Sequence, residues 1–105
     1  MIAVVSGKFL KKQPSSVIVD VNGVGYELHI SLNTFTDIQH LDEGSLYTYL
    51  LVREDALLLF GFSVPEEKAI FELLIGVSGV GAATARIMLS SMKPGEIMQA
   101  IGTAN

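Results

Sequence analysis

The chain has 105 residues, of which half are hydrophobic and 17% are charged. This composition predicts one packed domain or two very small ones, and it excludes a wholly disordered chain. There is no cysteine, which excludes disulfides and thiolate metal sites and is consistent with a reducing compartment. Seven basic against eleven acidic residues give a net charge of −4, which argues against a nucleic-acid binder that works through a basic face.

The first 62 residues carry the signals of β-structure. Val17, Val19 and Val21 share one face of an alternating segment, and an Asn22-Gly23 pair then predicts a hairpin turn. Residues 31–41 are expected to be a connection with one helical turn. Five short strands separated by turn signals predict a small barrel. The expected strands are residues 2–9, 16–21, 26–30, 45–52 and 56–62.

Composition changes at residue 63, where the chain is expected to become helical. Ser63 and Glu66 have the spacing of a capping box, and Pro65 suits the first helical position. Apolar residues keep helical spacing over 70–77 and again over 85–92, and a last short helix is expected at 96–101. The predicted organisation is therefore a barrel over 1–62 and a helical segment over 63–105.

The two predicted helices are joined by the glycine-rich stretch GVSGVGAATA, residues 76–85. A dinucleotide-binding loop needs a preceding strand and a third glycine, and here a helix precedes the loop and Thr84 stands at that position. A phosphate loop needs Gly-Lys-Ser/Thr, which this stretch lacks. One interpretation that remains is a tight helical turn with no further role.

The other interpretation is a phosphate site built from the main chain. The second helix opens after Gly81, so its first N–H groups have no partner within the helix and lie at the positive end of the helix dipole. We expect the N–H groups from Val80 to Ala82 to bind a phosphate, because Gly79 and Gly81 present no side chains to block it. Such contacts hold a duplex without reading its sequence, and they need few lysines.

Three separated segments together resemble the RuvA family, the DNA-binding subunits of the bacterial Holliday-junction branch-migration complex. They are VIVDVNGVGYELHIS, VREDALLLFGF and LLIGVSGVGAATARIMLS, in this order and spacing. The resemblance covers residues 1 to about 101. It implies a five-stranded OB-fold barrel at residues 1–62 that forms a homotetramer. It also implies an incomplete helix-hairpin-helix DNA-binding domain at residues 63–105.

The resemblance also implies which residues meet DNA. The charged tip is expected to be the family's acidic pin, Glu54 and Asp55 with Arg53 beside them, whose carboxylates repel phosphates at the crossover. From the sequence alone, a solvated turn is the favoured interpretation of this tip, and the family resemblance reverses that preference. Ala83 lies where some relatives have a basic side chain, so Arg86 is the only cation in the second helix of the hairpin. The residues expected to bind DNA are Ser78, Gly79, Val80, Gly81, Ala82, Ala83 and Arg86.

The implied function is that of a non-catalytic subunit in recombination and repair. Such a subunit recognises four-way junctions and supports branch migration by a RuvB-type hexameric ATPase, and a RuvC-type resolvase is a further partner. A second hairpin and an ATPase-docking domain are expected beyond residue 105, so we expect the chain to be a fragment of a longer protein.

We expect no catalytic site, cofactor or metal site. His29 and His40 have no histidine or cysteine neighbours at ligand spacing. Two other function classes stay open. One is a truncated oligomeric scaffold, which the apolar strands on both sides of the charged tip would suit. The other is an enzyme acting on DNA, such as a glycosylase, for which the hairpin offers no candidate catalytic residue.

Overall fold

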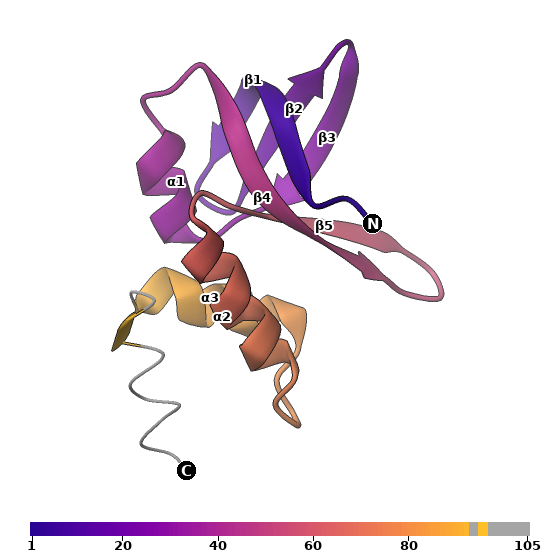
Figure 1. Ribbon diagram of the computed structural model, residues 1–105, viewed down its shortest axis with the longest axis vertical. Helices are drawn as coiled ribbons and strands as arrows, with labels where there is room; N and C mark the ends of the chain where they lie inside the picture. The colour runs from indigo at the N-terminus through magenta and orange to yellow at the C-terminus, as the bar shows by residue number, and fades with distance from the viewer. Residues whose placement is uncertain (93–94, 97–105) are drawn as a thin grey trace.

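The computed structural model of the chain describes residues 1–92 and 95–96, which form a five-stranded barrel followed by helices (Figure 1). The helix expected at 96–101 lies, apart from Glu96, outside the described residues. Within the described part, no helix has the length and apolarity that a membrane crossing requires. The elements are β1 (Val4–Gln13), β2 (Ser16–Val21), β3 (Val24–His29), α1 (Leu32–Ile38), β4 (Glu43–Val52), β5 (Leu57–Phe62), α2 (Pro65–Ile75) and α3 (Ala82–Ser91).

The barrel closes in the strand order β1-β2-β3-β5-β4, with β4 pairing back onto β1. All pairs are antiparallel except β3 and β5, which meet in a short parallel contact at His29 and Phe60. The predicted five-stranded barrel is therefore confirmed. The turn between β2 and β3 has φ values of 51° at Asn22 and 93° at Gly23, as the Asn-Gly pair predicts.

The barrel interior follows from the alternation of apolar residues along its strands. Val17 and Val19 of β2 are fully buried, and Val17 pairs with the equally buried Leu28 of β3. The residues that alternate with these buried ones along each strand face outward and are more exposed, as on any half-buried strand. Ile38 at the end of α1 packs into the same cluster, so α1 closes one part of the barrel.

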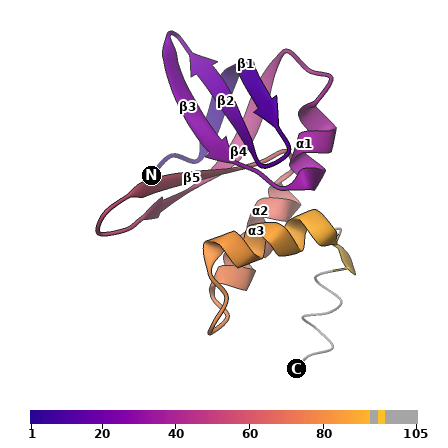
Figure 2. The same ribbon diagram turned by 180° about the vertical axis from the view of Figure 1, so that it is seen from behind.

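Helix α1 is longer than the single turn expected from the sequence. It starts after Ser31, whose side chain accepts a hydrogen bond from the backbone N–H of Thr34. This is a side-chain N-cap, which satisfies one of the unpaired donors at the start of a helix. Figure 2 shows α1 between the barrel strands and α3.

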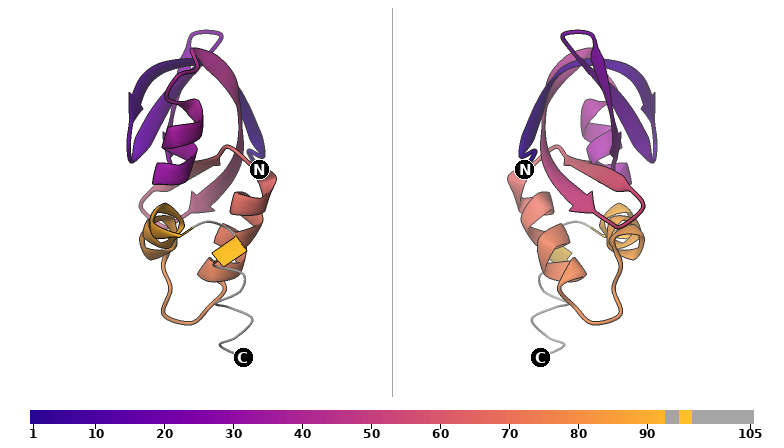
Figure 3. Two further views of the ribbon diagram at one scale, coloured as in Figure 1. Left: turned by 90° about the vertical axis from the view of Figure 1, so that its left-hand side faces the viewer. Right: turned by 90° about the vertical axis from the view of Figure 1, so that its right-hand side faces the viewer.

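Strand β5 is apolar on both faces because it serves two cores. Leu59 packs inside the barrel, whereas Phe60 and Phe62 pack against α2 and α3. Phe71 of α2 lies at the centre of this second cluster, with ring centroids 5.0 Å from Phe60 and 5.1 Å from Phe62. Part of the apolar surface that suggested an intermolecular interface is thus covered by the chain's own helices (Figure 3).

The expected capping box at Ser63 does not form. The N-cap of α2 is Val64, which has no side-chain cap, and Pro65 occupies the first helical position as predicted. The Ser63 hydroxyl instead donates to Asp37 of α1 at 2.6 Å. A tertiary partner on a neighbouring helix therefore replaces the local one that the spacing suggested.

Candidate nucleic-acid interface

Two glycines in the turn between α2 and α3 have different backbone conformations. Gly79 has φ +86°, which a residue with a side chain adopts only under strain, whereas Gly81 is extended at φ −88° and ψ 171°. Of these two glycines, only Gly79 has a positive φ. A Cβ atom added at either position would have no heavy atom within 4 Å, so the main chain there is open to solvent.

The start of α3 offers donors to an approaching group. Gly81 is its N-cap and makes no side-chain capping bond, and Ala85 is the residue whose N–H returns to the Gly81 carbonyl, at 2.9 Å. The N–H groups of residues 82–84, in the first turn, therefore lack intrahelical acceptors. The N–H of Val80, expected to be a phosphate donor, is already engaged with the Val77 carbonyl at 3.1 Å. The candidate donor set thus moves from residues 80–82 to residues 82–84.

The turn is anchored on one side and exposed on the other. Val80 and Ala82 pack into the cluster beneath the helices. Ser78, Gly79 and Ala83 are exposed. The turn lies at the end of the helical pair away from the barrel (Figure 3), and of the predicted site residues it exposes Ser78, Gly79 and Ala83 there.

A groove of about 290 Å³ joins this surface to the barrel. Its walls carry Arg53 from the β4–β5 hairpin and Arg86 from α3, which the sequence places in separate domains. It also carries His29, whose ring lies 5.4 Å from that of Phe60 and which sequence reasoning considered only as a metal ligand. The lining residues are His29, Arg53, Leu58, Phe60, Ala82, Ala83 and Arg86.

Arg86 also holds the helix to the barrel. It is half-buried, and its Nη1 donates to the carbonyl of Ile30 at 3.2 Å. A guanidinium has five N–H donors, so this contact leaves others to face a phosphate. The expected DNA contact of Arg86 stays a prediction, and the structure adds a packing role.

The acidic residues lie at the end of the β4–β5 hairpin, which projects beyond the barrel (Figure 1). The backbone N–H of Arg53 donates to the Ala56 carbonyl at 2.8 Å, which closes the loop. Glu54 and Asp55 occupy its two bend positions and are exposed, and neither lines the groove. The arrangement therefore places two carboxylates beyond a region that carries two arginines and an open helix N-terminus.

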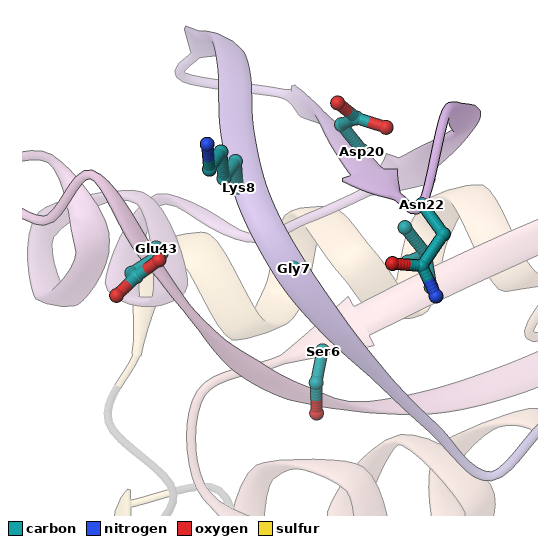
Figure 4. Close-up of a pocket in the computed structure, with 7 residues that line it drawn as sticks. Ser6, Gly7, Lys8, Asp20, Asn22 and Glu43 are labelled. Atoms are coloured by element: carbon teal, nitrogen blue, oxygen red, sulfur yellow. The ribbon is translucent and has the colours of Figure 1, made fainter.

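A second hollow, of about 360 Å³, lies on the barrel away from these residues. Lys8 of β1 pairs with Asp20 of β2 and Glu43 of β4, so charges alternate across three strands. Figure 4 shows that the labelled side chains are spread around the hollow and do not converge on one point. The described residues contain no group of three side chains able to hold a metal ion. This hollow therefore offers no comparable site.

Comparison with known proteins finds a matching family model and relatives that share one description. The family model of the RuvA N-terminal domain matches residues 1–61. The Holliday junction branch migration complex subunit RuvA of Flavobacterium psychrophilum is 48% identical over 105 residues, 100% of this chain and 54% of that protein. The proteins of the same description from Christiangramia forsetii and Neisseria meningitidis are each 47% identical, over 98% and 96% of this chain and 53% of their own length. The chain thus spans about half the length of these relatives.

Proposed function

Because the chain belongs to the RuvA family, we propose that it is the front half of a non-catalytic subunit that binds four-way DNA junctions. The observation that carries this proposal is the open main chain at the start of α3. There the N-cap is Gly81, and no side chain caps the helix. Gly79 and Gly81 present no side chain to an approaching group. A phosphate bound there would meet backbone donors and the positive end of the helix dipole.

The acidic tip supplies the preference for junctions. Glu54 and Asp55 would repel phosphates that come close to the end of the β4–β5 hairpin. The turn at residues 78–84 would attract phosphates on an arm of the junction, further from its centre. A continuous duplex would bring its backbone against the tip. An opened four-way junction offers a centre that the tip can occupy, so the repulsion disfavours the wrong substrate.

The branch-migration role follows as part of the same proposal. In this proposal the ATP-driven movement of the DNA comes from a RuvB-type hexameric partner, and a RuvC-type resolvase acts on the same junction. The relatives extend to about twice the length of this chain, and we assign ATPase docking to that remaining part.

A binding comparison tests the proposal directly. The 105-residue chain is titrated against a four-way junction and against a linear duplex of the same sequence, at one stated salt concentration, since affinity for DNA depends on salt. Tighter binding to the junction supports the proposal. Equal binding to both, or none to either, refutes it.

One observation favours an additional scaffold role. Val52 and Leu57 at the outer end of the β4–β5 hairpin are 67% and 71% exposed, and Tyr47 is 39% exposed. The helices that cover β5 leave this end uncovered. We propose that the barrel domain, residues 1–62, forms a homotetramer through it, and light scattering tests this for the isolated chain.

A further inference from the structure

Residues 30–34, which are the β3–α1 connection and the first turn of α1, hold the helical pair onto the barrel through directed hydrogen bonds. Every one of these residues contributes a backbone or side-chain group to a bond with α2 or α3. The bonds to α3 run from Arg86 to the Ile30 carbonyl, from the Leu32 N–H to the Ser90 hydroxyl, and from the Asn33 amide to the Leu89 and Met92 carbonyls.

The bonds to α2 converge on a single carboxylate, that of Glu67. Its side chain is 1% exposed, although it stands in the first turn of a helix whose other acidic residue there, Glu66, is exposed. Glu67 accepts a hydrogen bond from the Ser31 hydroxyl at 2.9 Å and another from the Thr34 hydroxyl at 2.6 Å. Ser31 is also the N-cap of α1, so the carboxylate binds α2 to the first turn of α1.

Burial of the Glu67 carboxylate opposes folding, so the arrangement is explained only if the direction of its hydrogen bonds has a role. Burial raises the pKa of Glu67, the two hydroxyl donors oppose that rise, and the nearby carboxylate of Asp37 adds to it. The aromatic cluster around Phe71 already supplies apolar contact between the helices and β5. Apolar contact has no preferred direction, whereas a buried carboxylate loses its partners as soon as the helices slide. A buried polar group of this kind selects one docking geometry rather than adding adhesion.

We propose that Glu67 is a positioning residue that fixes the helical pair on the barrel and so sets the spacing between the glycine turn and the acidic tip. This inference rests on the proposed function, because that spacing has a role only if both surfaces meet the same DNA. The turn attracts phosphates and the tip repels them, so junction preference requires a fixed separation between the two. Binding to duplex through the turn alone does not.

The decisive variant is Glu67→Leu, which keeps the side chain's approximate volume and removes both hydrogen bonds. Glu66→Leu is the matched control, because it makes the same change of charge and residue type at the exposed neighbouring position. Glu67→Gln is the rescue, since an amide can still accept from one hydroxyl and donate to the other. Melting temperature is recorded for each variant, so that loss of structure is separated from loss of position.

Two measurements read the effect. The first is the ratio of the duplex Kd to the junction Kd. We expect Glu67→Leu to lower this ratio at least threefold, with duplex affinity within twofold of the parent, while Glu66→Leu and Glu67→Gln keep the parent's ratio. The second is the spin-label distance between cysteines placed at the exposed Ala56 and Thr84, in a chain that has no cysteine of its own. Labelled chain is diluted with unlabelled chain, and we expect Glu67→Leu to broaden or shift the distance distribution.

An unchanged distance distribution in folded Glu67→Leu overturns the inference, whatever the DNA results. If the parent chain shows no junction preference, the proposed function fails, and the distance measurement still decides whether Glu67 fixes the geometry. If Glu67→Leu does not fold, Thr34→Val removes one donor to Glu67, and with it the acceptor of the Ser63 N–H, with little change of shape. Thr34→Ser, which keeps both bonds, is its control. We then expect the same changes from Thr34→Val alone, and a parent-like distance in Thr34→Val overturns the inference.

Discussion

Replacing Gly81 with valine places a branched side chain where the proposed phosphate site has only main chain. The backbone at Gly81 is extended, with φ −88° and ψ 171°, which β-branched residues adopt readily. An added Cβ meets no heavy atom of the protein within 4 Å. The substitution should therefore obstruct an approaching ligand while leaving the fold in place.

Gly81→Val should lower the stability of the chain less than it lowers the affinity for the junction. Glycine is a better N-cap than an apolar residue by about 1 kcal/mol, which corresponds to a fall of about 4–8 °C in melting temperature for a chain of this length. Loss of a hydrogen bond to a charged phosphate costs about 1.5–3 kcal/mol. Since each 1.4 kcal/mol is a factor of about ten, junction affinity should fall by about 10- to 100-fold.

Fluorescence anisotropy with a labelled four-way junction measures the affinity, and circular dichroism measures the melting temperature. Gly79→Ala is the contrasting variant, because φ of +86° there should cost about 1–3 kcal/mol of stability. Gly25→Ala, in the β2–β3 hairpin at the other end of the molecule, should leave affinity unchanged (Figure 1). A folded Gly81→Val chain that binds the junction like the parent refutes the main-chain phosphate site, and the turn is then only a tight helical connection.

Three further results are expected. Glu54→Gln with Asp55→Asn should raise duplex affinity about three- to tenfold and lower junction preference, because two unit charges 4 Å apart repel by about 1 kcal/mol in water; unchanged duplex binding contradicts the repulsive role. Leu57→Glu, at a position 71% exposed, should reduce the mass seen by light scattering without lowering the melting temperature by more than a few degrees; a monomeric parent contradicts the proposed tetramer. Stability of the parent relative to Glu67→Gln should fall as pH rises above about 4.5, as measured by urea unfolding.

The barrel could be predicted from sequence because its signals are local. Alternation in β2, the Asn22-Gly23 turn and the change of composition at residue 63 each depend on neighbours along the chain. Strand bounds accordingly agree to within a few residues, except that β1 continues to Gln13 through an irregularity between Phe9 and Lys11. The family resemblance can be recognised from the sequence for the same reason, since each of its three motifs is a continuous segment.

The groove and the contacts around Glu67 depend on pairings between distant segments, and no local pattern encodes them. The parallel contact of His29 with Phe60 brings the end of β3 beside β5, and only then do Arg53 and Arg86 line one groove. Glu67 follows Glu66 in a sequence that is typical of a solvated first helical turn. What distinguishes it is burial by α1, which no helix-capping rule predicts.

The sign of the expected pH dependence follows from the surroundings of Glu67. Desolvation by burial is the largest influence and raises the pKa, the hydroxyls of Thr34 and Ser31 lower it, and the carboxylate of Asp37 raises it. The pKa in the folded chain is therefore above the ordinary value of 4.5, so the folded state holds the proton over a range of pH in which the unfolded state has released it.

Stability contributed by that proton is complete below the unfolded pKa and is lost as pH rises through the folded one. The loss is about 1.4 kcal/mol for each pH unit that separates the folded pKa from the unfolded pKa. Glu67→Gln cannot titrate and lacks this loss, whereas Glu66→Gln, with the same change of charge at the surface, should keep it. The difference in unfolding free energy between the parent and Glu67→Gln should therefore turn against the parent over a range of pH that begins at about 4.5 and extends upward. A difference that stays constant across this range would mean that the carboxylate is not desolvated in the folded chain, which would contradict the buried contact of Glu67 with Ser31 and Thr34.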